Sequence, residues 1–223
     1  IYTRSFGVSE TMVGALISGF GVARVIIDVP GGVIAESRGP KKVLITGLIV
    51  VVVASIMCGF APTYFILFIG RFLEGLGSAL YVTSALVILG EVTKSSRRGR
   101  LLSVYTGTLL VGAMVGPGVG GVVADLWGLN ASFFVYAMLV GAGAILAQVM
   151  LPETFITSSP ENRRHKFSFH DLRALLGDRT YVSVNLATFA IFFTRAGITS
   201  TVIPLFSNDN LHLSQTILGT VLT

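Results

Sequence analysis

Long apolar runs alternate with short polar segments along the whole chain. Within each run the apolar residues are continuous rather than alternating one by one, so the pattern predicts helices rather than strands. Six runs approach or exceed the roughly 20 residues that a helix needs to cross a bilayer. They are 11–35, 43–60, 64–89, 101–126, 132–151 and 181–206. Residues 214–223 begin one more run, so we expect an all-α membrane protein with six complete spans and one partial span.

The composition supports a membrane protein. Only 12% of the 223 residues are charged and 52% are hydrophobic, whereas soluble domains carry about 25% charged residues. Such a chain cannot cover a globular surface with polar groups. The 26 glycines suit helices that pack closely in lipid. The single cysteine, Cys58, lies in an apolar run and is interpreted as a packing residue that forms no internal disulfide.

Charge in the polar segments predicts the orientation. Three segments hold most of the basic residues: 36–42, 91–100 and 152–180. The intervening segments, 61–63 and 127–131, contain no lysine or arginine. The positive-inside rule places the three basic segments in the cytoplasm. The net charge of +5 is thus attributed to these segments, and no nucleic-acid partner is expected.

The longest polar segment predicts the domain organisation. Residues 152–180 are expected to form a cytoplasmic linker, with a short interfacial helix beginning at Ser168. The spans before it, in 1–151, would form a first bundle, and 181–223 would begin a second. The first residue is Ile rather than Met. We therefore interpret the chain as a piece of a longer protein in which most of a first helix is missing.

Five charged residues lie well inside the apolar runs, away from their ends, where charges are rare and usually functional. Asp28 is either a titrating acid or the salt-bridge partner of Arg24, which lies four residues earlier. Arg71 and Glu74 are three residues apart, so they either form a structural ion pair or tune a proton-carrying acid. Arg195 has no evident local partner and is expected to face a central cavity or the first bundle.

The segment between the first two spans contains Gly32, Glu36, Arg38, Gly39, Lys41 and Lys42. At these positions it resembles the signature loop of the major facilitator superfamily. Glu36 takes the place of the family's Asp. We expect Gly32 to let helices approach closely, Gly39 to permit a tight turn and the acid to anchor the loop cations. The alternative is an ordinary basic loop with turn glycines.

Two further motifs carry the same resemblance. Arg71-Phe-Leu-Glu74-Gly75-Leu-Gly77 is similar to the motif of the family's fourth helix, with Glu74 at the position of a Gln. The next run resembles the pattern that marks the family's antiporter branch, through Gly112, Gly116, Pro117, Gly120 and Gly121. Ser103 stands where that pattern has an earlier glycine, and plain helix packing is the alternative reading.

The resemblance implies a secondary active transporter rather than an enzyme. It implies proton-coupled efflux of drugs or other small organic solutes by alternating access, with Asp28, Arg71 and Glu74 as the coupling residues. The alternatives are a proton-coupled importer of a sugar or organic acid and a membrane scaffold that transports nothing. Expected partners are a small-molecule substrate, protons and the lipid bilayer. No cofactor is expected, because the proton gradient supplies the free energy, and the three histidines show no metal-binding spacing. We expect an integral protein of the plasma membrane, in bacteria the inner membrane.

Overall fold

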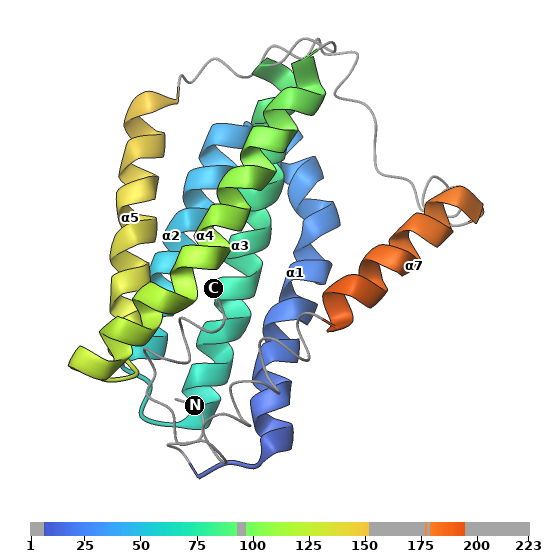
Figure 1. The fold of residues 1–223 in the computed structure, drawn as a ribbon. Helices are drawn as coiled ribbons and strands as arrows, with labels where there is room; N and C mark the ends of the chain where they lie inside the picture. Colours follow the sequence, from blue (N-terminus) through green and yellow to red (C-terminus); the bar gives the residue numbers. More distant parts are fainter. Residues whose placement is uncertain (1–6, 93–96, 152–176, 178, 195–223) are drawn as a thin grey trace.

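The computed structural model describes residues 7–92, 97–151, 177 and 179–194, and the part of the chain so described is helical without strands (Figure 1). This confirms the predicted all-α class. The helices are α1 (Glu10–Arg38), α2 (Pro40–Gly59), α3 (Tyr64–Val92), α4 (Arg98–Trp127), α5 (Ala131–Met150) and α7 (Arg179–Thr194).

Five of these helices, α1 to α5, are long and apolar enough to cross a membrane. The sequence predicts a sixth complete span over 181–206. The structure describes this region only as the 16-residue helix α7, and the rest of it lies outside the described residues. The predicted interfacial helix at Ser168, the partial span 214–223 and Arg195 also lie outside them.

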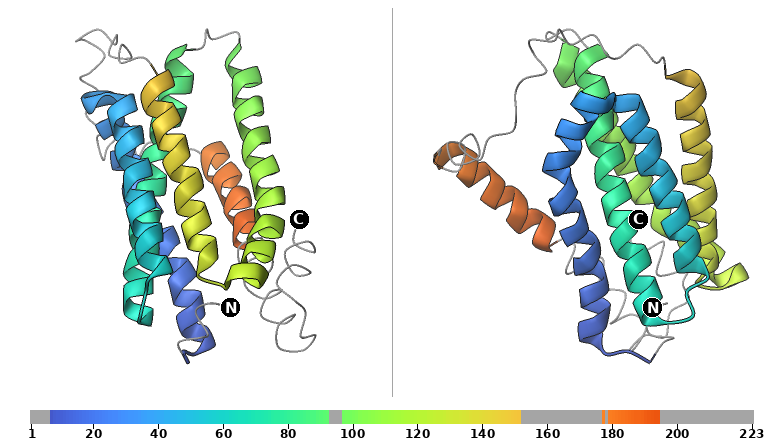
Figure 2. Two further views of the ribbon diagram at one scale, coloured as in Figure 1. Left: turned by 90° about the vertical axis from the view of Figure 1, so that its left-hand side faces the viewer. Right: turned by 180° about the vertical axis from the view of Figure 1, so that it is seen from behind.

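Consecutive helices from α1 to α5 run in opposite directions (Figures 1 and 2). The end of α1 at Arg38, the start of α2 at Lys41 and the start of α4 at Arg98 therefore lie at the same end of the bundle. The described parts of segments 36–42 and 91–100 share one side, as the alternation predicts, and nearly all of 152–180 lies outside the described residues. That this side faces the cytoplasm stays a prediction.

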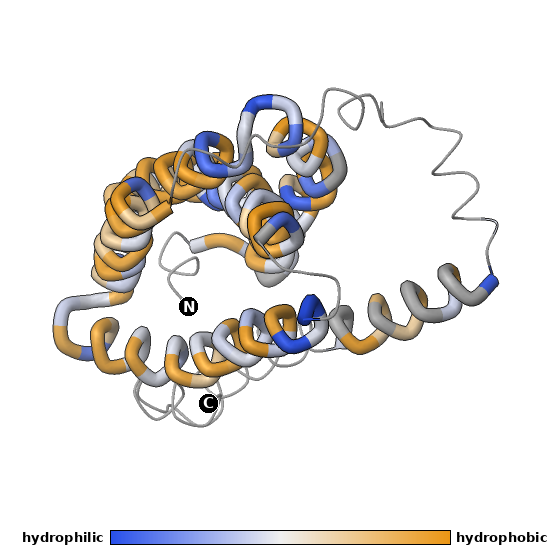
Figure 3. Tube along the Cα trace, turned by 90° about the horizontal axis from the view of Figure 1, so that it is seen from above, coloured by the Kyte–Doolittle hydropathy of each residue, from blue (hydrophilic) through white to orange (hydrophobic). Residues whose placement is uncertain are grey.

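Helix α3 lies at the centre of the packing. It makes its most extensive contacts with α2 and α1, and α2 also packs along α5, whereas α4 touches α3 and α5 less. Hydrophobic residues predominate along these helices (Figure 3), and many of the large ones are exposed. Val25 is 74% exposed and Val149 is 78% exposed, which in water would be unfavourable but in a bilayer places apolar atoms against lipid.

The segment between the first two helices differs from the predicted loop. Helix α1 continues through Glu36 to Arg38, and α2 begins at Pro40, so Gly39 alone lies between them. Gly39 has φ +96° and donates its N–H to the carbonyl of Ala35. A positive φ favours glycine, so the predicted turn residue is confirmed. The predicted loop is wrong because the helix continues past the apolar run and ends only where the Gly-Pro pair breaks it.

Gly32 also differs from expectation. It lies inside α1, and a Cβ there would have no neighbour within 4 Å. The close approach falls instead to the adjacent Gly31, which is buried and where a Cβ would lie 3.2 Å from Oγ1 of Thr83. One residue along a helix turns the side chain by about 100°, which is enough to exchange these roles.

A buried charge network as the candidate functional site

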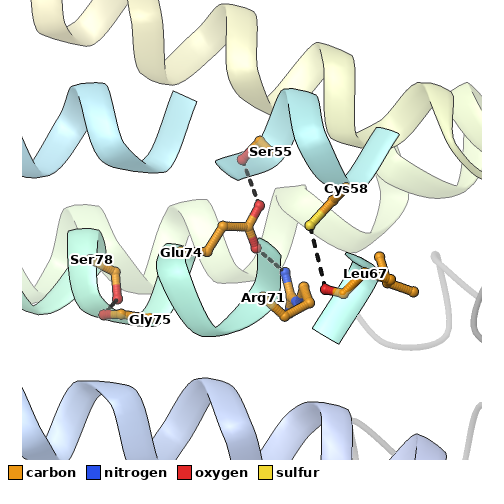
Figure 4. Close-up of polar contacts among 7 residues, drawn as sticks. All are labelled: Ser55, Cys58, Leu67, Arg71, Glu74, Gly75 and Ser78. Carbon is orange, nitrogen blue, oxygen red and sulfur yellow. Dashed lines mark hydrogen bonds and ion pairs between the residues drawn. The ribbon is translucent and has the colours of Figure 1, made fainter. Parts of the chain in front are cut away.

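Glu74 on α3 is the buried acid at the centre of the site (Figure 4). Glu74 is 1% exposed, and both of its carboxylate oxygens are hydrogen-bonded. Ser55 on α2 donates its hydroxyl to Oε1 at 2.5 Å, and Arg71 donates Nη1 to Oε2 at 2.5 Å. The donors satisfy a charge that would otherwise be costly to bury. Glu74 thus joins α2 to α3 and holds Arg71.

Arg71 is the more accessible partner of this ion pair. Its side chain is 31% exposed, against 2% for Glu74. The guanidinium carbon lies 5.2 Å from the ring centroid of Phe20 on α1, within the range of a cation–π contact. The salt bridge and the ring together fix the orientation of the guanidinium, with part of its surface left open.

The two glycines of the same motif let the helices approach closely enough for this network to form. A Cβ on Gly75 would lie 2.5 Å from the carbonyl oxygen of Phe20 on α1. A Cβ on Gly77 would lie 2.7 Å from the carbonyl oxygen of Gly47 on α2. Real Cβ atoms do not approach other atoms so closely, so both sites require glycine. The motif therefore packs α3 against α1 and α2.

Cys58 and Ser78 border the network without joining it. The Cys58 thiol is buried and points to the carbonyl of Leu67 at 3.8 Å. Ser78 donates its hydroxyl to the carbonyl of Gly75 at 2.9 Å, within its own helix. The burial of Cys58 agrees with its interpretation as a packing residue.

Arg24 and Asp28 lie on α1 as two half-buried charges. No ion pair joins them, so the salt-bridge alternative is absent from the described part of the chain. Phe20, Arg24 and Asp28 are spaced four residues apart and lie along one face of α1. This stripe begins at the ring that contacts Arg71.

Two tyrosines that the sequence analysis missed belong to the same region. Arg24 lies within electrostatic range of Tyr105 on α4 and of Tyr136 on α5. Tyr136 is also within electrostatic range of Glu74, Arg71 and Tyr81. Charged and phenolic groups of α1, α3, α4 and α5 thus lie close enough to influence one another electrostatically. No sequence motif marks these tyrosines, since each stands alone in an apolar run.

The antiporter-like motif lies on α4, with Pro117 inside the helix. A Cβ at Gly112, Gly116 or Gly120 would have no neighbour within 4 Å. Of the five motif residues only Gly121 is buried. Helix packing by the first three glycines is therefore not seen among the described residues.

The remaining predicted residues lie at the basic end of the bundle. Glu36, Arg38 and Lys42 are exposed and Lys41 is half-buried. At the same end, Arg98 donates Nη2 to the carbonyl of Gly90 at 3.2 Å, which connects the start of α4 to the end of α3. Within the described ranges, no cluster of His, Cys, Asp or Glu could hold a metal ion.

Known proteins with similar sequences are membrane transporters. The chain is 24% identical over 220 residues to an uncharacterized MFS-type transporter of Methanocaldococcus jannaschii, with 96% of this chain and 56% of that protein covered. It is 28% identical to Multidrug resistance protein 1 of Bacillus subtilis, covering 71% of this chain and 40% of the relative. It is 24% identical to Quinolone resistance protein NorA of Staphylococcus aureus, covering 67% and 37%. The chain thus spans about half or less of the length of these relatives.

The family model of the Major Facilitator Superfamily matches residues 1–223. Together with the five apolar helices, this match identifies an integral membrane protein. The chain belongs to the Major Facilitator Superfamily, whose members are transporters of small molecules and not enzymes.

Proposed function

We propose that the complete protein exports drugs or other small organic solutes in exchange for protons. Support comes from relatives named for multidrug and quinolone resistance and from the antiporter-like motif around Pro117 of α4. The motif is the feature that favours export over import. Substrate would bind between two bundles, one of them formed by helices of this chain, and the bundles would alternate in access.

The observation that supports proton coupling is the environment of Asp28. It is a half-buried carboxylate more than halfway along a membrane helix, without an ion-pair partner in the described structure. Such an acid can gain and lose a proton without breaking a salt bridge. Protonation of Asp28 would weaken the binding of a cationic solute, and deprotonation would restore it.

Glu74 has a different role in this proposal. Both of its oxygens accept hydrogen bonds and the residue is buried, so it acts as a fixed counter-ion. It holds Arg71 in place. The exposed part of the Arg71 guanidinium can then respond to the charge of a solute or proton on the transport path. Glu74 is therefore assigned to positioning and Asp28 to proton transfer.

The remaining assignments follow from this mechanism. The proton gradient is the only energy source and no cofactor takes part. The basic end of the bundle, with Arg38, Lys42 and Arg98, would face the cytoplasm of a cell bounded by the plasma membrane. In a bacterium this is the inner membrane.

The test is proton movement in inverted vesicles that carry the complete reading frame. A pH-sensitive dye reports the gradient before and after a cationic drug is added. We expect the drug to dissipate the gradient. Asp28→Asn and Arg71→Ala should reduce the response to that of protein-free vesicles, whereas Asp28→Glu should retain it.

Glu91→Gln is the matched control, because it removes an exposed carboxylate at the end of α3 and should leave the response unchanged. An intact drug response in Asp28→Asn would refute the assignment of Asp28. Proton movement together with a sugar or organic acid in right-side-out vesicles, without a drug response, would establish an importer instead.

A further inference from the structure

A groove of about 470 Å³ lies between α2 and α5, away from the charge network. Ile45, Ile49 and Val52 line it from α2. Its α5 wall is Gly141, Ala144, Ile145, Gln148 and Val149. This volume is within the range of about 300–1,000 Å³ that holds one small ligand.

Side-chain size explains why the groove is at this end of the helix pair. At the other end α2 and α5 are in close contact, because the Phe134 ring packs on Gly59 and lies 4.8 Å from the ring of Phe60. Toward the basic end, Gly141 and Ala144 are too small to fill the space. The nearest atom to a Cβ at Gly141 would be on Val52, at 3.8 Å.

The groove leads to two lysines. Lys41 lies four residues before Ile45, and Lys42 lies seven before Ile49, so helical periodicity places both on the groove face of α2. Lys42 is exposed and Lys41 half-buried. Neither forms an ion pair with a carboxylate in the described part of the chain. An apolar groove with two cations one turn beyond it, neither of them ion-paired among the described residues, is complementary to an apolar chain with an anionic head.

Gln148 adds a polar group to the α5 wall. It lies near the end of α5, on the same side of the bundle as the start of α2. Its amide has no hydrogen-bond partner among the described residues. An amide in an apolar wall is stabilised when a ligand supplies hydrogen-bonding atoms.

We propose that this groove binds an anionic phospholipid. One acyl chain lies between α2 and α5, the phosphate group contacts Lys41 and Lys42, and Gln148 hydrogen-bonds the ester region. The charge of the head group distinguishes this site from ordinary contact with bilayer lipid, since a zwitterionic lipid gains little from two lysines.

The test uses the complete reading frame reconstituted in vesicles with a trace of photoreactive lipid. Phosphatidylglycerol and phosphatidylcholine, each with a photoreactive acyl chain, are compared, and the labelled peptides are mapped. We expect phosphatidylglycerol to label peptides of α2 and α5 preferentially. The double variant Lys41→Gln/Lys42→Gln should reduce this labelling about 25-fold, since each lysine near an anionic head group contributes roughly a factor of five.

Matched variants separate the groove from its surroundings. Ala144→Phe should fill the groove and abolish labelling by both lipids, whereas Ala142→Phe, at an exposed position outside the groove, should not. Arg97→Gln/Arg100→Gln removes two exposed cations from α4 and should change nothing. The lysine variant alters only the polar end of α2, so it tests the proposal even where Ala144→Phe does not fold. Equal labelling by the two lipids, or full labelling of the lysine variant, would overturn the proposal.

Discussion

Ser55 and Ser84 are two fully buried serines in opposite hydrogen-bonding states. Ser55 donates to the Glu74 carboxylate, whereas the hydroxyl of Ser84 has no partner among the residues that the structure describes. A lost hydrogen bond to a charged group leaves a buried acceptor unsatisfied, but loss of an unpaired hydroxyl removes only a desolvation cost. The same chemical change at the two sites should therefore have different effects.

We expect Ser55→Ala to lower the free energy of unfolding by about 1–2 kcal/mol, and Ser84→Ala to leave it unchanged or raise it slightly. The measurement is thermal unfolding of the purified complete protein in detergent micelles. Equal shifts of the apparent Tm in both variants would contradict the hydrogen-bond assignment.

Glu74 provides a second test at the residue scale. Glu74→Gln keeps an acceptor for Ser55, and the fourth-helix motif that this chain resembles has Gln at the position. We expect a cost near 1 kcal/mol for Glu74→Gln but about 3 kcal/mol for Glu74→Leu, which leaves Arg71 without its partner. Unfolding in a series of denaturing detergent concentrations measures both. A Gln variant as unstable as the Leu variant would mean that the negative charge, rather than the acceptor, is essential.

The sequence identifies the charged residues of this network but not its serine. Arg71 and Glu74 are conspicuous because charges are rare in apolar runs. Ser55 is not, since a single serine in a membrane helix is common and its partner lies 19 residues away on another helix. The pairing depends on the rotation of α2 against α3, which helical periodicity alone does not specify.

At the scale of helices, the crossing of α2 and α3 depends on Gly47 and Gly77. A Cβ on either residue would lie 2.7 Å from the carbonyl oxygen of the other. Backbone atoms cannot move aside as the end of a side chain can. The crossing therefore tolerates no side chain at either position.

Gly77→Ala should force α2 and α3 apart and cost about 1–3 kcal/mol, as overpacking does. Gly14→Ala is the matched control in α1, because a Cβ there would meet nothing within 4 Å. It should be neutral or stabilise the helix by up to about 1 kcal/mol. Apparent Tm values in micelles compare the two, and a tolerated Gly77→Ala would show that the helices can separate without loss.

The corner between α1 and α2 shows where prediction from sequence succeeds and where it fails. The turn at Gly39 is predicted correctly because Gly-Pro is a strong local signal. The helix ends are wrong because polar residues such as Glu36 and Arg38 were interpreted as loop, although charged residues are good helix formers. A membrane helix can continue into water, so polarity marks the membrane boundary rather than the helix end.

Gly39→Ala should cost about 1–2 kcal/mol, because its φ of +96° is unfavourable for any residue with a Cβ. Gly90→Ala, near the end of α3, has no positive φ and no close neighbour, and should be tolerated. Thermal unfolding of both variants decides this point. A stable Gly39→Ala variant would mean that the corner relaxes to another geometry.

At the scale of the molecule, the alternating helix directions make the orientation testable. Cys58, the only cysteine of the chain, is 0% exposed, so a new cysteine can be labelled against a low background. Asn130→Cys lies between α4 and α5, at the end of the bundle opposite Arg38 and Lys42, and Arg97→Cys lies at the basic end; both positions are exposed. In intact cells that express the complete reading frame, a membrane-impermeant maleimide should label Asn130→Cys and spare Arg97→Cys.

The reverse labelling pattern would place the basic end outside and contradict the predicted orientation. The five spans before residue 151 are well predicted at this scale, in number and order, because each is a long apolar run. The arrangement of the helices in space is not, because nearly every face of every helix is apolar and hydropathy cannot tell a lipid-facing side from a packed one.

The two glycines of the α3 motif have a mechanical consequence. Successive residues of a helix are rotated by about 100°, so Gly75 and Gly77 lie on nearly opposite sides of α3, one against α1 and the other against α2. Since backbone meets backbone on both sides, α3 cannot slide or rotate by one residue without displacing both neighbours. We therefore expect α1, α2 and α3 to move as one rigid body. We expect any hinge to lie outside these three helices, so that a displacement of Arg71 moves all three together.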